Sequence, residues 1–152
     1  MKQDNLSRLR KRASAEMWFS GIISVLALVI GILCLVKLSD NAAKQYLTNA
    51  VYSFTIAAEL LILSCIFADI RKNGKPFARA VINRLRIMSI ILLIAGNMPN
   101  YIEIPVSDTS KAIVTSFNLQ NMLMIVVALI ILLISEIFVY GRKLQEDNDL
   151  IA

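Results

Sequence analysis

The stretch M-W-F-S-G-I-I-S-V-L-A-L-V-I-G-I-L-C-L-V, Met17 to Val36, contains no charged residue over 20 positions. A helix rises about 1.5 Å per residue, so roughly 20 apolar residues cross a hydrocarbon core about 30 Å thick. Three further apolar runs follow it: Thr48 to Ala68, broken only by Glu59, then Ile87 to Ile102, then Ala112 to Ser135. The pattern predicts an all-α integral membrane protein with four transmembrane helices.

We expect these spans at about 17–37, 48–70, 85–102 and 115–139, within a single domain covering residues 1–152. The first run is longer than a signal-peptide core and no small-x-small site follows it, so we expect it to be retained as a span. The third run has only 16 residues and needs its flanks to reach across.

Lysine and arginine are concentrated in alternate connectors. The N-terminal segment, the second loop and the C-terminal tail hold 13 of the 16, whereas the first and third loops hold three. Short cytoplasmic loops retain Lys and Arg, so we expect a multi-pass protein of the cell membrane with both termini in the cytoplasm. The formal charge of +5 then matches anionic lipid headgroups, and direct nucleic-acid binding is not expected.

The composition also argues against catalysis. The chain has no histidine, which removes the usual zinc site and the Ser-His base. It has no Gly-rich phosphate loop and no acid cluster with metal-ligand spacing, so we expect no enzyme activity and no cofactor. Cys34 and Cys65 lie about 20 Å apart in predicted depth, too far for a disulfide.

Small residues recur along three of the predicted spans, and such stripes mark the places where membrane helices pack closely. We expect a tight bundle from these stripes, with Leu, Ile and Val facing lipid. The stripes are Ser20, Ser24, Ala27 and Gly31; Ser53, Ala57, Ser64 and Ala68; and Asn121, Ala128 and Ser135.

Glu59 lies near the centre of the second span, about eleven residues from either end. An ionised carboxylate at that depth is costly, so it should be protonated, paired or beside water. Asn97 of the third span falls at a similar depth, and the two side chains form our candidate intramembrane polar site. Either they hold two helices together, or Glu59 binds a proton, cation or ligand. Pro99 should kink or end the third span, leaving Asn97 to Pro105 as a broken helix or re-entrant segment.

The second loop carries an amphipathic pattern that leads into the third span, with Phe77, Val81, Leu85 and Met88 at helical spacing. Gly74 and Pro76 open it. This interfacial amphipathic helix, placed between spans two and three, either anchors on headgroups or docks a cytoplasmic partner. The acidic tail either lies against this loop, binds a partner or stays solvated. The predicted cytoplasmic docking residues are Lys75, Phe77, Arg79, Arg84, Arg86, Glu146, Asp147 and Asp149.

Two stretches carry a resemblance to a family. These are NGKPFARAVINRLRIMSIILLIAG, Asn73 to Gly96, and EIFVYGRKLQEDNDLIA, Glu136 to Ala152. They resemble the bacterial four-span proteins grouped as domain of unknown function 2975, which have a G-x-P-F turn before span three and a tail of the form L-x-x-E-N-D-L-T-V. Gly74, Pro76 and Phe77 match the turn; Leu144 and the residues from Glu146 to Leu150 match the tail, with Ile151 and Ala152 replacing Thr-Val.

The resemblance supplies no activity and no catalytic residue. Members of that family are often encoded beside a small helix-turn-helix regulator, which implies a non-enzymatic membrane protein that holds or tunes a DNA-binding protein. We therefore expect a membrane-bound regulator that binds a cytoplasmic transcription factor. The alternative is a small transporter or exporter subunit, or a peptide-immunity protein, that uses Glu59 and the broken third span; in one version a homo-oligomer encloses its polar cavity.

Overall fold

The computed structural model describes the backbone of residues 2–37, 43–74, 76–107 and 110–151, and the side chains within 7–37, 45–74, 76–100 and 114–148. Its described part contains four helices and one two-stranded hairpin. In chain order these are α1 (Lys2–Val36), α2 (Ala43–Asn73), α3 (Arg79–Gly96), β1 (Asn100–Ser107), β2 (Ser110–Ser116) and α4 (Leu119–Ile151).

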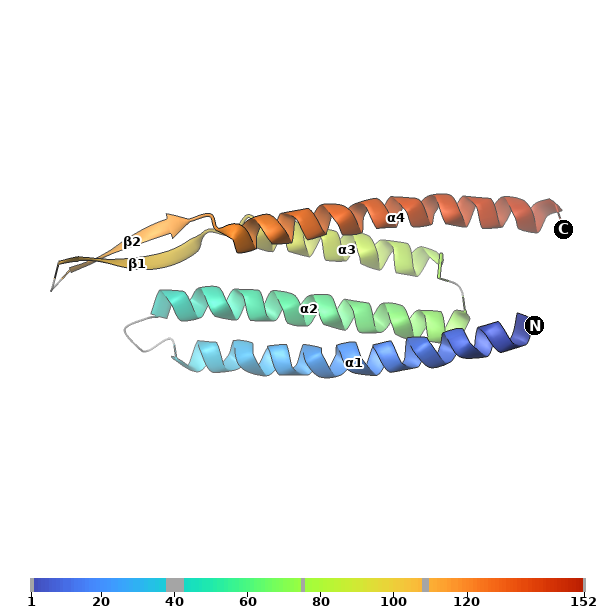
Figure 1. The fold of residues 1–152 in the computed structure, drawn as a ribbon, viewed down its shortest axis with the longest axis horizontal. Helices are drawn as coiled ribbons and strands as arrows, with labels where there is room; N and C mark the ends of the chain where they lie inside the picture. Colours follow the sequence, from blue (N-terminus) through green and yellow to red (C-terminus); the bar gives the residue numbers. More distant parts are fainter. Residues whose placement is uncertain (1, 38–42, 75, 108–109, 152) are drawn as a thin grey trace.

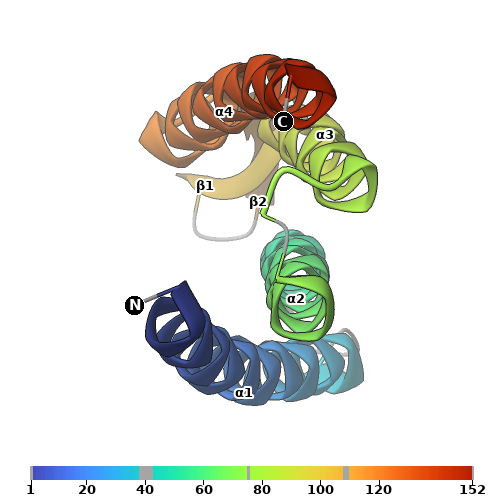
Figure 2. The same ribbon diagram turned by 90° about the vertical axis from the view of Figure 1, so that its right-hand side faces the viewer.

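The helices form two antiparallel pairs, α1 with α2 and α3 with α4, which meet through α2 and α3 (Figure 1). Among the described residues, the backbone of α1 approaches α2 alone and that of α4 approaches α3 and no other helix. Viewed from the end, the helices follow one another in an open arc (Figure 2). The close packing predicted from the small-residue stripes is present within each pair, while the four helices together form an open arc. Both chain ends lie at the same end of the molecule.

Three helices in the described part of the chain are long and apolar enough to cross a membrane. They lie within Ser7–Val36 of α1, Gln45–Asn73 of α2 and Leu119–Asn148 of α4. Their apolar side chains are largely exposed, for example Ile22 at 59% and Leu133 at 65%, as expected for surfaces that face lipid. The helix α3 is not among the three, since its 18 residues include three arginines.

The small residues predicted on the first span lie at the contact between α1 and α2. Ser20 and Ser24 are 3% and 2% exposed. The hydroxyl of Ser24 donates to the carbonyl of Ala57 at 2.8 Å, and that of Ser64 donates to the carbonyl of Met17 at 3.0 Å. Small side chains let the backbones of α1 and α2 come close together, and their hydroxyl groups find hydrogen-bond acceptors across the contact. The stripe predicted on the first span is therefore confirmed.

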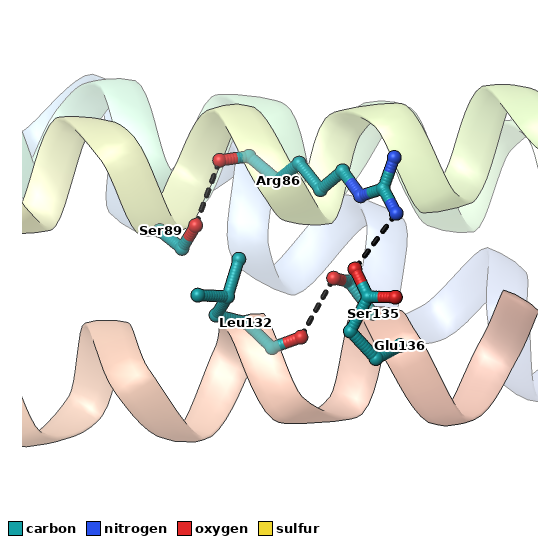
Figure 3. A network of polar contacts seen from close by, with 5 residues as sticks. All are labelled: Arg86, Ser89, Leu132, Ser135 and Glu136. Atoms are coloured by element: carbon teal, nitrogen blue, oxygen red, sulfur yellow. Dashed lines mark hydrogen bonds and ion pairs between the residues drawn. The ribbon is translucent and has the colours of Figure 1, made fainter.

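The stripe on α4 faces α3. Asn121, Ala128 and Ser135 are all fully buried, and Ser89 of α3 is buried with them. Ser89 and Ser135 donate to carbonyls three residues back in their own helices, at 2.8 and 2.7 Å (Figure 3). No hydroxyl is left unpaired in this contact, and the two helices can pack closely.

At Gly96, its last residue, α3 lies close to the backbone of α4. An added Cβ there would lie 2.8 Å from Cγ1 of Ile125 and 3.2 Å from the backbone oxygen of Asn121. Because backbone atoms cannot move aside cheaply, we expect Gly96→Ala to destabilise the protein by about 1–3 kcal/mol. Gly21→Ala is the control, since its Cβ would meet only Ser64 Oγ at 3.6 Å. Denaturant unfolding in detergent measures both, and equal stability of the two variants would contradict the prediction.

The third predicted span is wrong at its outer end. The helix stops at Gly96, and residues 100–107 form β1, which pairs antiparallel with β2. The predicted broken or re-entrant segment is instead one arm of this hairpin, which extends beyond the helices (Figure 1). Pro99 lacks a backbone donor and disfavours the helical conformation in the residue before it, so the chain leaves α3 here. The fourth helix accordingly begins at Leu119, after β2, and not at 115.

The predicted interfacial helix is not a separate element. The chain turns at Gly74, whose φ is 64°, a left-handed value that suits glycine. The helix α3 then begins at Arg79 and runs on without a break to Gly96 alongside α4. Only five residues separate α2 from α3, too few for an independent amphipathic helix. Val81, Leu85 and Met88 belong to α3 itself, and Phe77 lies in the turn before it.

Candidate functional site

Glu59 lies on the face of α2 that meets the second helix pair. It shares this face with Tyr52 and Ile66, seven residues away on either side, and all three are less than 10% exposed. Residues seven apart lie on one helix face. Ile66 packs with Val81 and Met88 of α3, and Tyr52 bonds the segment after α3. The carboxyl group of Glu59 is thus placed between the two helix pairs.

Both carboxyl oxygens of Glu59 are buried and have no hydrogen-bond partner among the described residues. A buried polar group without a partner destabilises the fold, and an ionised one destabilises it far more. Of the three states expected for this side chain, paired, hydrated or protonated, pairing is excluded within the described structure. The protonated and the hydrated states both remain compatible with this burial.

Asn97 does not meet Glu59, and the predicted contact between the two side chains is wrong. Asn97 is exposed, and its amide donates to the carbonyl of Leu93 at 2.8 Å. The reason is local: the helix ends at Gly96, so Asn97 caps α3 and satisfies a last-turn carbonyl.

A buried amide network joins α2, the end of α3 and the start of α4. Tyr52 donates to Asn100 Oδ1 at 2.6 Å, and Asn100 donates to Asn121 Oδ1 at 2.5 Å. Asn121 Nδ2 then donates to the carbonyls of Gly96 and Met98 at 2.9 and 2.7 Å. This network holds both helix pairs together at one end, where the hairpin begins.

The sequence analysis missed this network, although its members were visible. Asn121 was treated as one of the small residues of a packing stripe, and Asn100 as part of a broken helix. Two asparagines and a tyrosine near the ends of apolar segments are a signal in themselves, because side-chain amides hydrogen-bond across membrane helices. Which of these side chains pair depends on where α3 ends. The lengths of the apolar runs in the sequence do not show that the helix ends at Gly96.

A second polar contact joins α2 to α3 at the opposite end. Arg84 donates to Asp69 Oδ2 at 2.5 Å and to the carbonyl of Cys65 at 2.7 Å. Glu59 lies along α2 between this contact and the amide network. The carboxyl group of Glu59 therefore lies between two polar contacts that join α2 to the second helix pair. It takes part in neither of them.

The predicted docking residues differ in their surroundings, and three of them, Arg79, Arg86 and Glu146, line one groove. Arg84 is committed to Asp69, and Phe77 packs edge-on against Phe138 with ring centroids 5.1 Å apart. Arg86 pairs with Glu136 at 2.7 Å, as Figure 3 shows. Glu146 pairs with Arg142 of its own helix at 2.7 Å. Arg79 and Asp147 are exposed, Lys75 lies outside the described residues, and Asp149 belongs to α4 with an undescribed side chain.

The cysteines and potential metal ligands add no further site in the described part of the chain. Cys34 and Cys65 are free thiols, as their predicted depths require. The described residues include no group of three or more His, Cys, Asp or Glu side chains that could hold a metal ion.

Comparison with known proteins finds no family model, no curated protein and no solved structure that matches this chain.

Proposed function

We propose that all four helices cross a bacterial cytoplasmic membrane, with both termini in the cytoplasm. The helix α3 contributes the fourth span, although its 18 residues rise only about 27 Å. Its three arginines lie in its first half, and Ile87 to Gly96 are uncharged. Support comes from the lysine and arginine distribution and from the proximity of both chain ends (Figure 1). Trp18 and Tyr140, both largely exposed, suit the headgroup level on that side.

The proposed role is that of a non-enzymatic regulator that binds a small cytoplasmic helix-turn-helix transcription factor. The observation that carries this role is the length of α4, which continues as a helix past its contact with Phe77, at Gly141, to Ile151. Beyond that contact α4 projects past the other helices at this end (Figure 1).

The projecting part of α4 presents a mixed apolar and acidic face. We define the tail strip as Tyr140, Leu144, Asp147 and Asn148, which are all exposed and lie on one side of the helix. Amphipathic helices with such anchors bind in grooves of partner proteins. DNA-binding domains carry a basic surface, which Asp147 complements in charge. The resemblance noted for residues 136–152 lies on this same segment.

Capture of partners by the full chain tests this role. Full-length protein solubilised from its own host should recover a helix-turn-helix regulator, identified by mass spectrometry. Leu144→Ala with Asp147→Ala should reduce that recovery at least about tenfold, because each change removes one anchor, worth about 1 kcal/mol or more at an interface centre. The control is Leu119→Ala with Gln120→Ala at the other end of α4. Recovery of no such regulator, or an equal loss in the control, would count against the role.

The unpaired carboxyl of Glu59 favours a second candidate function. A small transporter or exporter subunit, or a peptide-immunity protein, would use this acid to bind and release a proton or cation between the helix pairs. In this function the carboxyl group is required and the tail strip is not. Variants at the two places therefore discriminate between the candidates.

A further inference from the structure

A groove of about 310 Å³ lies between the first turns of α3 and the last turns of α4. Its polar lining consists of Arg79, Asn83 and Arg86 from α3, and Arg142, Lys143 and Glu146 from α4. We propose that this groove binds the phosphate of an anionic phospholipid. The proposal rests on the proposed topology, which puts this end of α3 and α4 at headgroup level, but not on the regulatory role.

The groove contains more cations than its carboxylates neutralise. Arg142 is bonded to Glu146, and Arg86 to Glu136 at the edge of the groove. Arg79 and Lys143 are exposed and have no ionic partner among the described residues. Two uncommitted positive charges thus remain on opposite walls of one depression, where a phosphate can accept hydrogen bonds from both.

The face of α3 that lines the groove with basic side chains carries apolar side chains further along the helix. Arg79, Asn83 and Arg86 are followed on the same helix face by Ile90 and Ile94. Both isoleucines are more than half exposed, at 54% and 59%. On α4, Leu132 and Leu129 are also exposed on the stretch leading away from the groove. A ligand with one phosphate and two acyl chains matches this sequence of cations followed by isoleucines and leucines.

Charge selects the class of lipid. A zwitterionic headgroup brings its own cation into a groove that is already positive, whereas an anionic headgroup adds only negative charge. A free phosphate ion satisfies the cations but gains nothing from Ile90 and Ile94. We therefore assign the groove to an anionic phospholipid such as a phosphatidylglycerol.

Native mass spectrometry of the full chain in detergent tests the assignment. Phosphatidylglycerol and phosphatidylcholine with identical acyl chains would be titrated separately, with inorganic phosphate as a third ligand. We expect phosphatidylglycerol to bind at least about tenfold more tightly than either of the others. Arg79→Gln with Lys143→Gln should weaken phosphatidylglycerol binding about 10- to 30-fold, since each surface cation contributes about one kcal/mol to anionic lipid binding.

The matched control is Arg10→Gln with Lys11→Gln, which removes two exposed cations from α1. This control should retain phosphatidylglycerol binding. An equal loss in the control would overturn the site in favour of general surface charge, and equal binding of phosphatidylcholine would overturn the charge argument. Inorganic phosphate binding as tightly as the lipid would overturn the acyl contacts. Labelling of Asn83→Cys, on a chain with both native cysteines replaced by serine, tests the topology separately.

Discussion

Replacing Asn121 with alanine is expected to destabilise the protein by about 2–4 kcal/mol. The side chain is fully buried and donates to the carbonyls of Gly96 and Met98. It also accepts from Asn100 at 2.5 Å. Truncation leaves these groups buried without partners. Each such group costs about 1–3 kcal/mol in proteins generally, and single interhelical bonds in membranes contribute about 0.6 on average.

Asn97→Ala is the matched control for this prediction. Asn97 has the same chemistry and lies one residue after α3, but it is exposed and bonds only the carbonyl of Leu93. Its loss should cost less than about 0.5 kcal/mol. Reversible unfolding in mixed detergent micelles, followed by circular dichroism, would measure both variants. If Asn121→Ala proved no less stable than Asn97→Ala, the amide network would not be what holds the helix pairs together.

The parts of the fold that were predictable from sequence are those that depend on local spacing. The stripe of Ser20 and Ser24 on α1, and that of Asn121, Ala128 and Ser135 on α4, are buried as expected. The burial of small residues at helical spacing can be predicted without knowing which helix packs against them, because such residues permit close approach by any neighbour. Which helix packs against each stripe was not predictable from spacing alone, and the open arc in which the four helices follow one another was not predicted either.

The β-hairpin was missed although its residues signal it. The segment Ile102, Ile104 and Val106 alternates β-branched residues with others, and β-branched residues favour strands. The strand β1 ends at Ser107 and β2 begins at Ser110, on either side of a short polar stretch of the sequence. Counting uncharged runs assigned Ile102 to one span and Ala112 to the next, so the alternation was not used. The alternation of residues along a strand is not visible when only the length of an uncharged run is counted.

The predicted pairing of Glu59 with Asn97 failed for a related reason. It assumed that the third helix continued to residue 102, which would have placed Asn97 inside a span. Because the helix ends at Gly96, the carbonyl of Leu93 one turn back is the nearer acceptor for the side-chain amide of Asn97, and it also accepts from the Asn97 backbone N–H at 3.1 Å. Asn100 is bonded by Tyr52 instead. Seven residues of α2 separate Tyr52 from Glu59, a rise of about 10 Å.

Replacing Glu59 with leucine is expected to stabilise the folded protein by about 1–3 kcal/mol. Leucine has a similar volume and removes two buried oxygens that have no partner. Glu59→Gln keeps polar atoms in the same place and should leave the free energy of unfolding nearly unchanged. The detergent unfolding assay measures both variants. A leucine variant less stable than the native chain by more than about 1 kcal/mol would mean that the carboxyl group has a stabilising partner.

A stability gain at Glu59 would bear directly on function, because natural chains retain destabilising groups chiefly where activity requires them. Under the transport function, proteoliposomes containing the Glu59→Leu or Glu59→Gln variant should lose proton uptake driven by a pH gradient, although both variants fold. Glu16→Gln, which removes an exposed acid of α1, should keep it. If the native chain moves no more protons than the Glu59 variants, the transport function is excluded. Regulator capture by the tail strip would then be the remaining candidate, and Glu59 would have to matter through the packing of α2 on α3.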